Sequence, residues 1–405
     1  MVATSNIHYN LAAWSNATYV LAARRSNAGN AYQCITAGTS TVAPTGTAAN
    51  TAPGGTAHWK WLSAITYVSL ATWAAALPTT LTQPVVALLW NNGTVTPTSG
   101  TALLTLSGHT TTSTNTITVG CAPGESFRDS LAGGGTALAF GTASGVSVSL
   151  PGTVSATHYI VVSDANVFFD GIQFKDPLAT STSVMMEAAA GLSLVTLRNC
   201  LFDAACQNPN GLLIGNTGGY QAFNCLFVDR QSMTAAGYIF NLYQGHNTIL
   251  VNCTVVAVGD TGTGIGGNML TDNTGANTTG LAVKNCIFIG YGSTFFIASG
   301  NSPVAVDHCV FSTSTAYGGS TAAAVTDGGG NLYSKTAAAQ FVSATIDFRL
   351  KTGSAALDTG TPDTGHIASA DDIIRTSRPQ GSAWDIGCFE LLVAVLTRPQ
   401  LIWMD

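Results

Sequence analysis

Two aspartates stand at nearly the same place in neighbouring copies of a repeated phrase. Asp203 follows Cys200 by three residues, and Asp229 follows Cys225 by four. If these copies stack, the two carboxylates lie about 5 to 10 Å apart, the separation used by paired-carboxylate glycosidases. Asp is also favoured in turns, so the simpler interpretation is that both residues end strands. A lyase needs clustered Lys or Arg with acidic calcium ligands, and the repeats are poor in both.

The nine cysteines are a second source of chemistry. Their number is odd, and none forms the CxxC pair typical of zinc or redox sites. The same position of the repeated phrase holds a cysteine five times, which favours small buried side chains over reactive thiols (Cys200, Cys225, Cys253, Cys286 and Cys309). The histidines are isolated along the chain. We therefore expect no metal, no cofactor and no catalytic thiol.

Aromatic residues are concentrated near the amino terminus. Tyr19, Tyr32, Trp59 and Trp61 lie in a stretch of about 45 residues. Flat rings of this kind stack on sugars, which makes these four residues candidate glycan-binding residues. A module this small also needs its aromatics for its own core, so the alternative is a purely structural role.

These candidates are positioned by a repeat. The phrase is an apolar residue, a variable residue, Asn, Cys, a further residue and an aromatic or apolar residue, as in Leu197–Phe202, Ala222–Phe227, Leu250–Val255 and Val283–Phe288. A fifth copy, Val306–Phe311, has His308 in place of Asn. A degenerate copy lies at 168–174, and with Gly171 taken at the cysteine position the steps are 29, 25, 28, 33 and 23 residues.

The columns of this repeat predict a bend within each copy. The first residue is always apolar and the second varies, so the first faces inward and the second outward. The next inward aromatic comes five residues later, and an odd offset means that strand parity changes between the two positions. Asn tolerates the left-handed backbone conformation that a sharp bend needs. A period near 28 residues with short strands separated by bends predicts an all-β fold, a parallel β-helix with strands stacked about 4.8 Å apart.

The ends of such a coil expose core and need covers. Ser69 followed by the apolar stripe Leu70, Trp73, Ala74 and Leu77 and then by Pro78 predicts a cap helix near 69–77. We expect a β-rich N-terminal module over 1–62, the coil over 63–390, and an apolar tail over 391–405 that packs on a neighbouring subunit or on the flank of the coil. The glycine-rich stretch 259–267 predicts a protruding loop.

The closing stretch of the coil carries a resemblance. Asp358-Thr359-Gly360, followed by Asp385-Ile386-Gly387 and Glu390, resembles the closing segment of right-handed β-helix proteins of the pectate-lyase-like superfamily, in which a short turn and then a strand finish the coil. The N-terminal order Tyr19, Tyr32, Pro44, Gly55-Thr56 and Trp59 resembles a small module of bacteriophage tail and other virion proteins, with analogues among carbohydrate-binding modules. The first resemblance implies fold rather than chemistry.

Composition excludes several classes of protein. Only 8% of the 405 residues are charged, the net charge is −6, and 46% are apolar. Uninterrupted apolar runs such as Val85–Trp90 and Leu391–Leu396 are six residues long, far short of the roughly 20 needed to cross a bilayer, so we expect no membrane insertion. No basic stripe is present, which argues against nucleic acid as a partner. Met1–Trp14 lacks the features of a signal peptide.

These observations favour a virion protein made in a host cytoplasm. The resemblance implies a bacteriophage tail spike or fibre, a homotrimer that contacts other virion proteins and adheres to a host-surface glycan. Short polar Thr, Ser and Asn side chains suit such a surface, because fixing them costs little entropy. The alternatives are a glycan-degrading enzyme, a lyase or hydrolase, and a capsid-decorating protein.

Overall fold

The computed structural model describes residues 2–47, 55–131, 140, 145–151, 158–177, 184–189, 194–204, 212–215, 218–230, 239–242, 248–258, 270–275, 281–290, 296–300, 304–314, 317–318, 325–363 and 371–392. Within them the chain is all-β, and its helices are few and short. No helix among these residues is long and apolar enough to cross a membrane. The glycine-rich stretch 259–267 and the tail from 393 onward lie outside the described residues.

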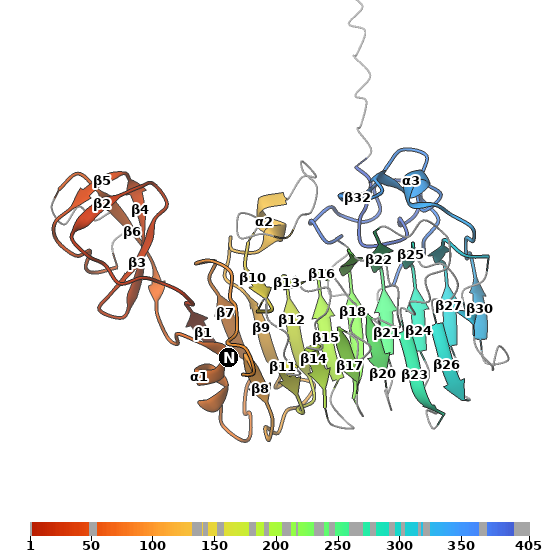
Figure 1. Ribbon diagram of the computed structural model, residues 1–405, viewed down its shortest axis with the longest axis horizontal. Helices are drawn as coiled ribbons and strands as arrows, with labels where there is room; N and C mark the ends of the chain where they lie inside the picture. Colours follow the sequence, from red (N-terminus) through yellow and green to blue (C-terminus); the bar gives the residue numbers. More distant parts are fainter. Residues whose placement is uncertain are drawn as a thin grey trace, which may run out of the picture.

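Three long parallel sheets form the body of the molecule (Figure 1). The ten-stranded sheet contains, in spatial order, β1 (Ala3–Ile7), β7 (Val85–Leu89), β9 (Ile117–Cys121), β12 (Val167–Asp170), β15 (Leu194–Arg198), β18 (Gly219–Phe223), β21 (Thr248–Val251), β24 (Leu281–Lys284), β27 (Val304–Asp307) and β30 (Val325–Gly329).

The other two sheets complete each turn of the chain. The seven-stranded sheet contains β10 (Ser147–Ser149), β13 (Gln173–Asp176), β16 (Leu201–Ala204), β19 (Leu226–Asp229), β22 (Thr254–Ala257), β25 (Ile287–Ile289) and β28 (Val310–Phe311). The eight-stranded sheet contains β8 (Leu104–Leu106), β11 (His158–Val162), β14 (Val184–Ala188), β17 (Leu213–Gly215), β20 (Phe240–Leu242), β23 (Leu270–Gly275), β26 (Phe296–Gly300) and β29 (Tyr317–Gly318). From β12 onward, consecutive strands enter the three sheets in rotation, an arrangement compatible with a parallel β-helix.

The predicted bend is confirmed at the asparagine column. Asn199, Asn224, Asn252 and Asn285 have φ between 50° and 52°, and His308 has φ 49°, so every copy turns through the left-handed region at this position. The bend separates the ten-stranded from the seven-stranded sheet and changes strand parity. As a result, Leu197 before the bend and Phe202 after it are both buried in the same core.

The degenerate copy is in register one residue later than we predicted. Asp170 pairs with Arg198, and Gln173 pairs with Leu201. Gly171 therefore occupies the asparagine position, with φ 72°, and Ile172 the cysteine position. Phe169, rather than Phe168, is the inward residue, because it pairs with Leu197. Glycine reaches the bend conformation without a side-chain cost, which explains the substitution.

Side-chain ladders fill the interior of the three parallel sheets, which we call the stack. The rings of Phe174, Phe202 and Phe227 stack with centroids 4.8 Å apart, close to the strand spacing. Val255 interrupts the ladder, which resumes with Phe288, Phe311 and Tyr333 at 5.4 Å. The buried cysteine column runs beside it.

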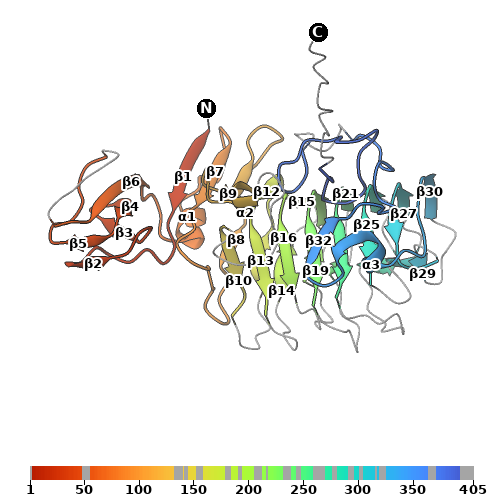
Figure 2. The same ribbon diagram turned by 90° about the horizontal axis from the view of Figure 1, so that it is seen from above.

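A second core lies outside the seven-stranded sheet. The residues from Leu332 to Leu392, which we call the C-terminal cover, include α3 (Ala337–Gln340), β31 (Phe341–Ser343) and β32 (Asp347–Leu350). Figures 1 and 2 show α3 and β32 lying over this sheet. Cover residues such as Phe348 and Phe389 pack on the outward Leu226 and Ile287. Both faces of this sheet are therefore buried from β16 to β28.

The resemblance implied a closing strand at 385–390, and the structure has none there. Instead these residues form a polar cluster within the cover. Arg378 and Glu390, both with fully buried side chains, form an ion pair of 3.2 Å. Asp372 accepts hydrogen bonds from the backbone N–H groups of Ile374, Thr376 and Glu390. Burial raises the pKa of Glu390 to about 6, although Arg378 opposes the shift.

The amino-terminal part of the chain contributes to two bodies. β1 pairs with β7 of the stack, although its residues fall within the N-terminal segment that we delimited at 1–62. The front module contains β2 (Ala17–Tyr19), β3 (Arg24–Asn27), β4 (Asn30–Thr36), β5 (Gly38–Ser40) and β6 (His58–Ala64). Its strands form two small antiparallel sheets, set off from one end of the stack (Figure 2).

Two further short helices flank this end of the stack. α1 (Leu70–Ala75) begins after Ser69, whose side chain accepts the Thr72 N–H, and it ends earlier than the predicted 77. Leu70, Trp73 and Ala74 join the core of the stack, and α1 contacts β8, the terminal strand of its sheet. α2 (Phe127–Leu131) follows β9.

Candidate functional site

The structure places Asp203 and Asp229 on opposite faces of the seven-stranded sheet. Asp203 pairs with Val228, and Asp229 pairs with Ala204, so the one-residue difference in their spacing from the cysteine reverses their orientation. Asp203 is bound by Arg230, with Nε to Oδ1 at 3.0 Å and Nη2 to Oδ2 at 3.1 Å. Asp229 has no exposed surface. The two carboxylates do not share a groove.

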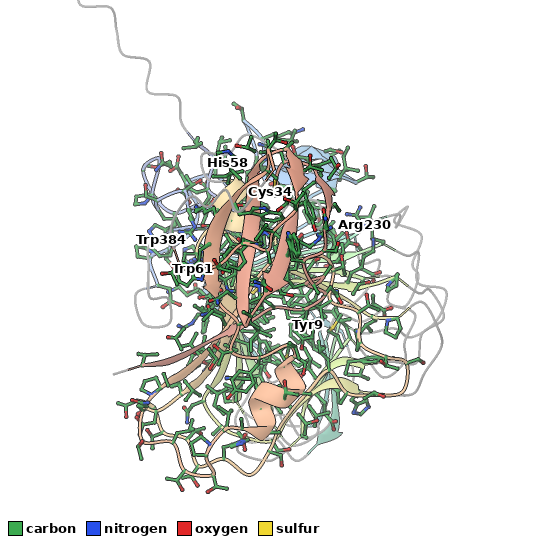
Figure 3. The ribbon with its side chains drawn as sticks, turned by 90° about the vertical axis from the view of Figure 1, so that its left-hand side faces the viewer. Tyr9, Cys34, His58, Trp61, Arg230 and Trp384 are labelled. Carbon is green, nitrogen blue, oxygen red and sulfur yellow. The ribbon has the colours of Figure 1, made fainter. Side chains whose placement is uncertain are left out.

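The four predicted aromatics are mostly interior. Tyr19, Tyr32 and Trp59 are 3%, 1% and 0% exposed and form the core of the front module. The rings of Tyr19 and Trp59 meet edge to face, with centroids 4.8 Å apart. Trp61 is the partly exposed member of the set, and its Nε1 donates to Asn30 Oδ1 at 3.1 Å. Figure 3, which faces the front module, labels Trp61 on the side opposite Arg230.

The front module is joined to the stack by a polar junction. The Arg24 guanidinium of β3 makes a bidentate ion pair with Glu125, with Nη1 at 2.9 Å from Oε2 and Nη2 at 2.8 Å from Oε1. Glu125 Oε2 also accepts the Asn91 N–H at 3.0 Å. The Glu125 side chain is 9% exposed and Arg24 is 18% exposed. A bidentate pair this sheltered holds its partners in a fixed orientation.

His8 extends this junction. Its ring is 2% exposed and stacks on Trp90 with centroids 5.0 Å apart. One ring nitrogen, Nε2, contacts Ser63 Oγ at 2.8 Å, and the other, Nδ1, contacts Asn92 Nδ2 at 3.0 Å. Burial and the nearby Arg24 charge lower the pKa of His8 from 6.5 to about 4. The imidazole is therefore neutral near neutral pH, which suits its uncharged partners.

A cleft of about 630 Å³ lies beside this junction. It is lined by Ala13, Trp14, Ser26, Asn27, Ala28 and Gly29 on the module side, by Ile65, whose N–H donates to Gly29 O at 2.8 Å, and by Thr66, Tyr67, Val68 and Thr72. These residues escaped the sequence search because they are spread over three short stretches. The sequence features that could have indicated these lining residues are Trp14 and the run Ile65-Thr66-Tyr67-Val68.

A second, smaller groove of about 400 Å³ crosses the outer face of β7, β9 and β12. Its charged residues have partners. Asp129 binds Arg375 at 2.6 Å, Arg128 binds Asp371 at 3.1 Å, and Asp170 accepts a hydrogen bond from Asn199 at 3.0 Å. The two ion pairs fasten the C-terminal cover to α2. Together the three contacts leave no unpartnered acid and base side by side among the described groove residues.

The environment of the cysteine column favours unreactive, protonated thiols. The five thiols are fully buried and unoxidised, and burial raises the pKa values of Cys200, Cys225, Cys253 and Cys286 well above 9. Backbone N–H groups contact the next thiol along the column, as from Cys253 N to Cys286 Sγ at 3.4 Å. Within the described residues, no three His, Cys, Asp or Glu side chains are grouped to hold a metal ion.

Comparisons with known proteins add no family to this description. No protein-family model, no curated protein and no solved structure matches the chain.

Proposed function

We propose that the chain is a structural protein of a bacteriophage particle, a β-helical tail spike or fibre that adheres to a glycan on the host surface. In this proposal the coil is right-handed, α1 caps its front end, and three copies assemble side by side. The protein sits on the virion, in contact with other virion proteins.

One observation carries the proposal. Three continuous parallel sheets make an elongated body, and a separate module is held at one end of it by a sheltered bidentate ion pair. A stiff body with a module held at one end suits an appendage that bridges a particle and a surface. Backbone ladders in every turn resist bending along the stack.

The surface of the stack supports assembly. The outer face of the ten-stranded sheet carries the small exposed residues Ala282, Ala305 and Thr326 in one column. Small side chains allow a neighbouring subunit to approach closely and lose little entropy when they are buried. The seven-stranded sheet is already covered by its own chain, so subunit contacts must use other faces.

The glycan-degrading alternative rested on Asp203 and Asp229, and their opposite orientation in the sheet separates the two carboxylates. A capsid-decorating protein would share the same fold, so location distinguishes it from an appendage.

Gold-labelled antibodies against the purified protein test the proposal on phage particles. We expect label at the tail, whereas label over the capsid would show a decorating protein. Absence of the chain from purified particles, checked by mass spectrometry, would overturn the proposal altogether.

A further inference from the structure

We infer that the cleft between the front module and the stack is the glycan-binding site, and that its ligand is an uncharged oligosaccharide. This inference rests on the proposed adhesive function and assigns it a place. It moves the site from the four aromatics suggested by the sequence to two others, Trp14 and Tyr67.

The two walls of the cleft each present one aromatic ring. The Trp14 N–H donates to Ser26 O of β3 at 2.9 Å, which attaches this residue to the front module. The Tyr67 N–H donates to Asn6 O of β1 at 3.1 Å, and Tyr67 O accepts the His8 N–H at 3.1 Å, which attaches Tyr67 to the stack. Both rings are half-buried, so each is supported from behind and keeps accessible surface in the cleft.

The remaining lining is polar without charge. Ser26, Thr66 and Thr72 contribute hydroxyl groups, and Asn27 contributes an amide. The Asn27 amide donates through Nδ2 to Pro44 O at 3.0 Å, and its Oδ1 has no partner within the described part of the chain. Lys, Arg, Asp and Glu are absent from the described lining. Aromatic faces bind the C–H groups of a pyranose, and amides and hydroxyls match its hydroxyl groups.

The absence of charged lining residues selects among saccharides. An acidic polysaccharide carries carboxylates or sulfates that need Arg or Lys partners to offset their desolvation. Arg24, the cation of the junction beside the cleft, is already paired with Glu125. A neutral hexose or N-acetylhexosamine chain carries no charge that must be desolvated in this environment. The cleft volume of about 630 Å³ lies in the range of small-ligand sites and holds a few sugar units.

Rigidity supports the assignment. The walls belong to different bodies, and the Arg24–Glu125 pair and the His8 contacts hold them in place beside the cleft. At the rim, Ala28 and Gly29 form a tight turn with φ of 46° and 76°, which places backbone rather than a bulky side chain at this edge. A preformed site loses less entropy on binding.

Titration calorimetry with the full-length protein tests the inference. The probes are neutral oligosaccharides of glucose, galactose and N-acetylglucosamine, with oligogalacturonate and oligosialic acid as acidic probes. We expect at least one neutral probe to bind and the acidic probes to bind at least tenfold more weakly. No heat with any neutral probe at millimolar concentration would overturn the inference, and so would preferential binding of an acidic probe.

Variants locate the site. Trp14→Leu and Tyr67→Leu keep apolar volume but remove the rings, so each should weaken binding about tenfold, while Tyr67→Phe should stay within about twofold. Trp61→Leu is the matched control in the same module and should leave binding unchanged. Thermal unfolding of each variant shows whether the fold is intact. Loss of binding in Trp61→Leu alone would move the site to the front module and refute the inference while leaving the adhesive function standing.

Discussion

At the scale of single residues, the asparagine column combines two roles that the sequence cannot separate. Every Asn of the repeat has the left-handed backbone. Asn285 also uses its side chain, accepting the Thr361 N–H at 3.0 Å and donating to Thr361 O at 2.6 Å, and Asn224 donates to Asp371 O at 2.8 Å. The column is therefore both the bend of the coil and the docking line of the C-terminal cover.

Asn252 separates these roles, because its buried side-chain amide has no partner in the described part of the chain. Asn252→Gly should change the free energy of unfolding by less than about 1 kcal/mol, since glycine adopts this φ freely. Asn252→Ala should cost about 1 to 2 kcal/mol through backbone strain. At Asn285 the glycine variant should itself cost about 1 to 3 kcal/mol, because it leaves Thr361 unpaired. Urea unfolding measures all three variants. Equal losses for both Asn252 variants would show that the backbone conformation is not what selects Asn there.

His8 gives the junction a defined pH dependence. Its pKa is about 4 in the folded chain and 6.5 when unfolded, so the unfolded state binds more protons between these values. The contribution of His8 is fully present above pH 6.5, is lost as the pH falls towards 4, and amounts to about 3 kcal/mol at about 1.4 kcal/mol per pKa unit. In His8→Gln this part of the pH dependence of unfolding should disappear. An unchanged pH profile in the variant would place the titration elsewhere.

At the scale of elements, the phenylalanine ladder stabilises the stack. Phe227 touches rings on both sides, with Phe202 stacked at 4.8 Å and Phe240 edge-on at 5.2 Å. Phe227→Ala should destabilise the fold by about 3 to 5 kcal/mol, because a stacked strand array cannot easily collapse around the cavity. The matched control is Val342→Ala, at a side chain that is 55% exposed, and it should cost under about 0.5 kcal/mol. Thermal or urea unfolding checks both, and similar values for the two would contradict the ladder's role.

The outer face of the ten-stranded sheet carries the assembly prediction. Ala305→Arg places a long charged side chain in the small-residue column and should convert the proposed trimer to folded monomers. Sedimentation velocity measures the size of the assembly. Ile346→Arg, at a position 63% exposed on the C-terminal cover, is the control and should leave assembly intact. A trimer that persists in Ala305→Arg would exclude this face.

Much of the coil was predictable from the sequence, for a physical reason. A repeated element must bury the same positions in each turn, so the apolar columns, the bend and the parallel strands were visible in the spacing of Leu197, Asn199 and Phe202. The register of the copy near Gly171 was missed because glycine replaces Asn there. The C-terminal cover was missed because its partners, Leu226 and Ile287, read as part of ordinary apolar strands.

The candidate site was much less predictable. Residue type alone singles out the largest aromatics, and in a small module these are needed inside, as Trp59 and Tyr32 are. The cleft exists only because the front module is fixed against the stack, and that orientation depends on Arg24 and Glu125, which are 101 residues apart. No local pattern encodes such a pair.

At the scale of the whole molecule, three parts are joined. The stack supplies length, the C-terminal cover protects one flank, and the front module lies at one end (Figures 1 and 2). The low charge, 8% of residues, leaves a surface of short polar groups suited to close packing with other subunits. In the proposed trimer, the cleft at the junction lies at the same end of each copy.

A cryo-electron microscopy reconstruction of the purified protein tests the stacked fold and its proposed assembly together. We expect three parallel rods, each with its strands stacked along the long axis and with all three front modules at one end. A reconstruction of single compact globules, or of copies whose front modules take no fixed orientation, would contradict it.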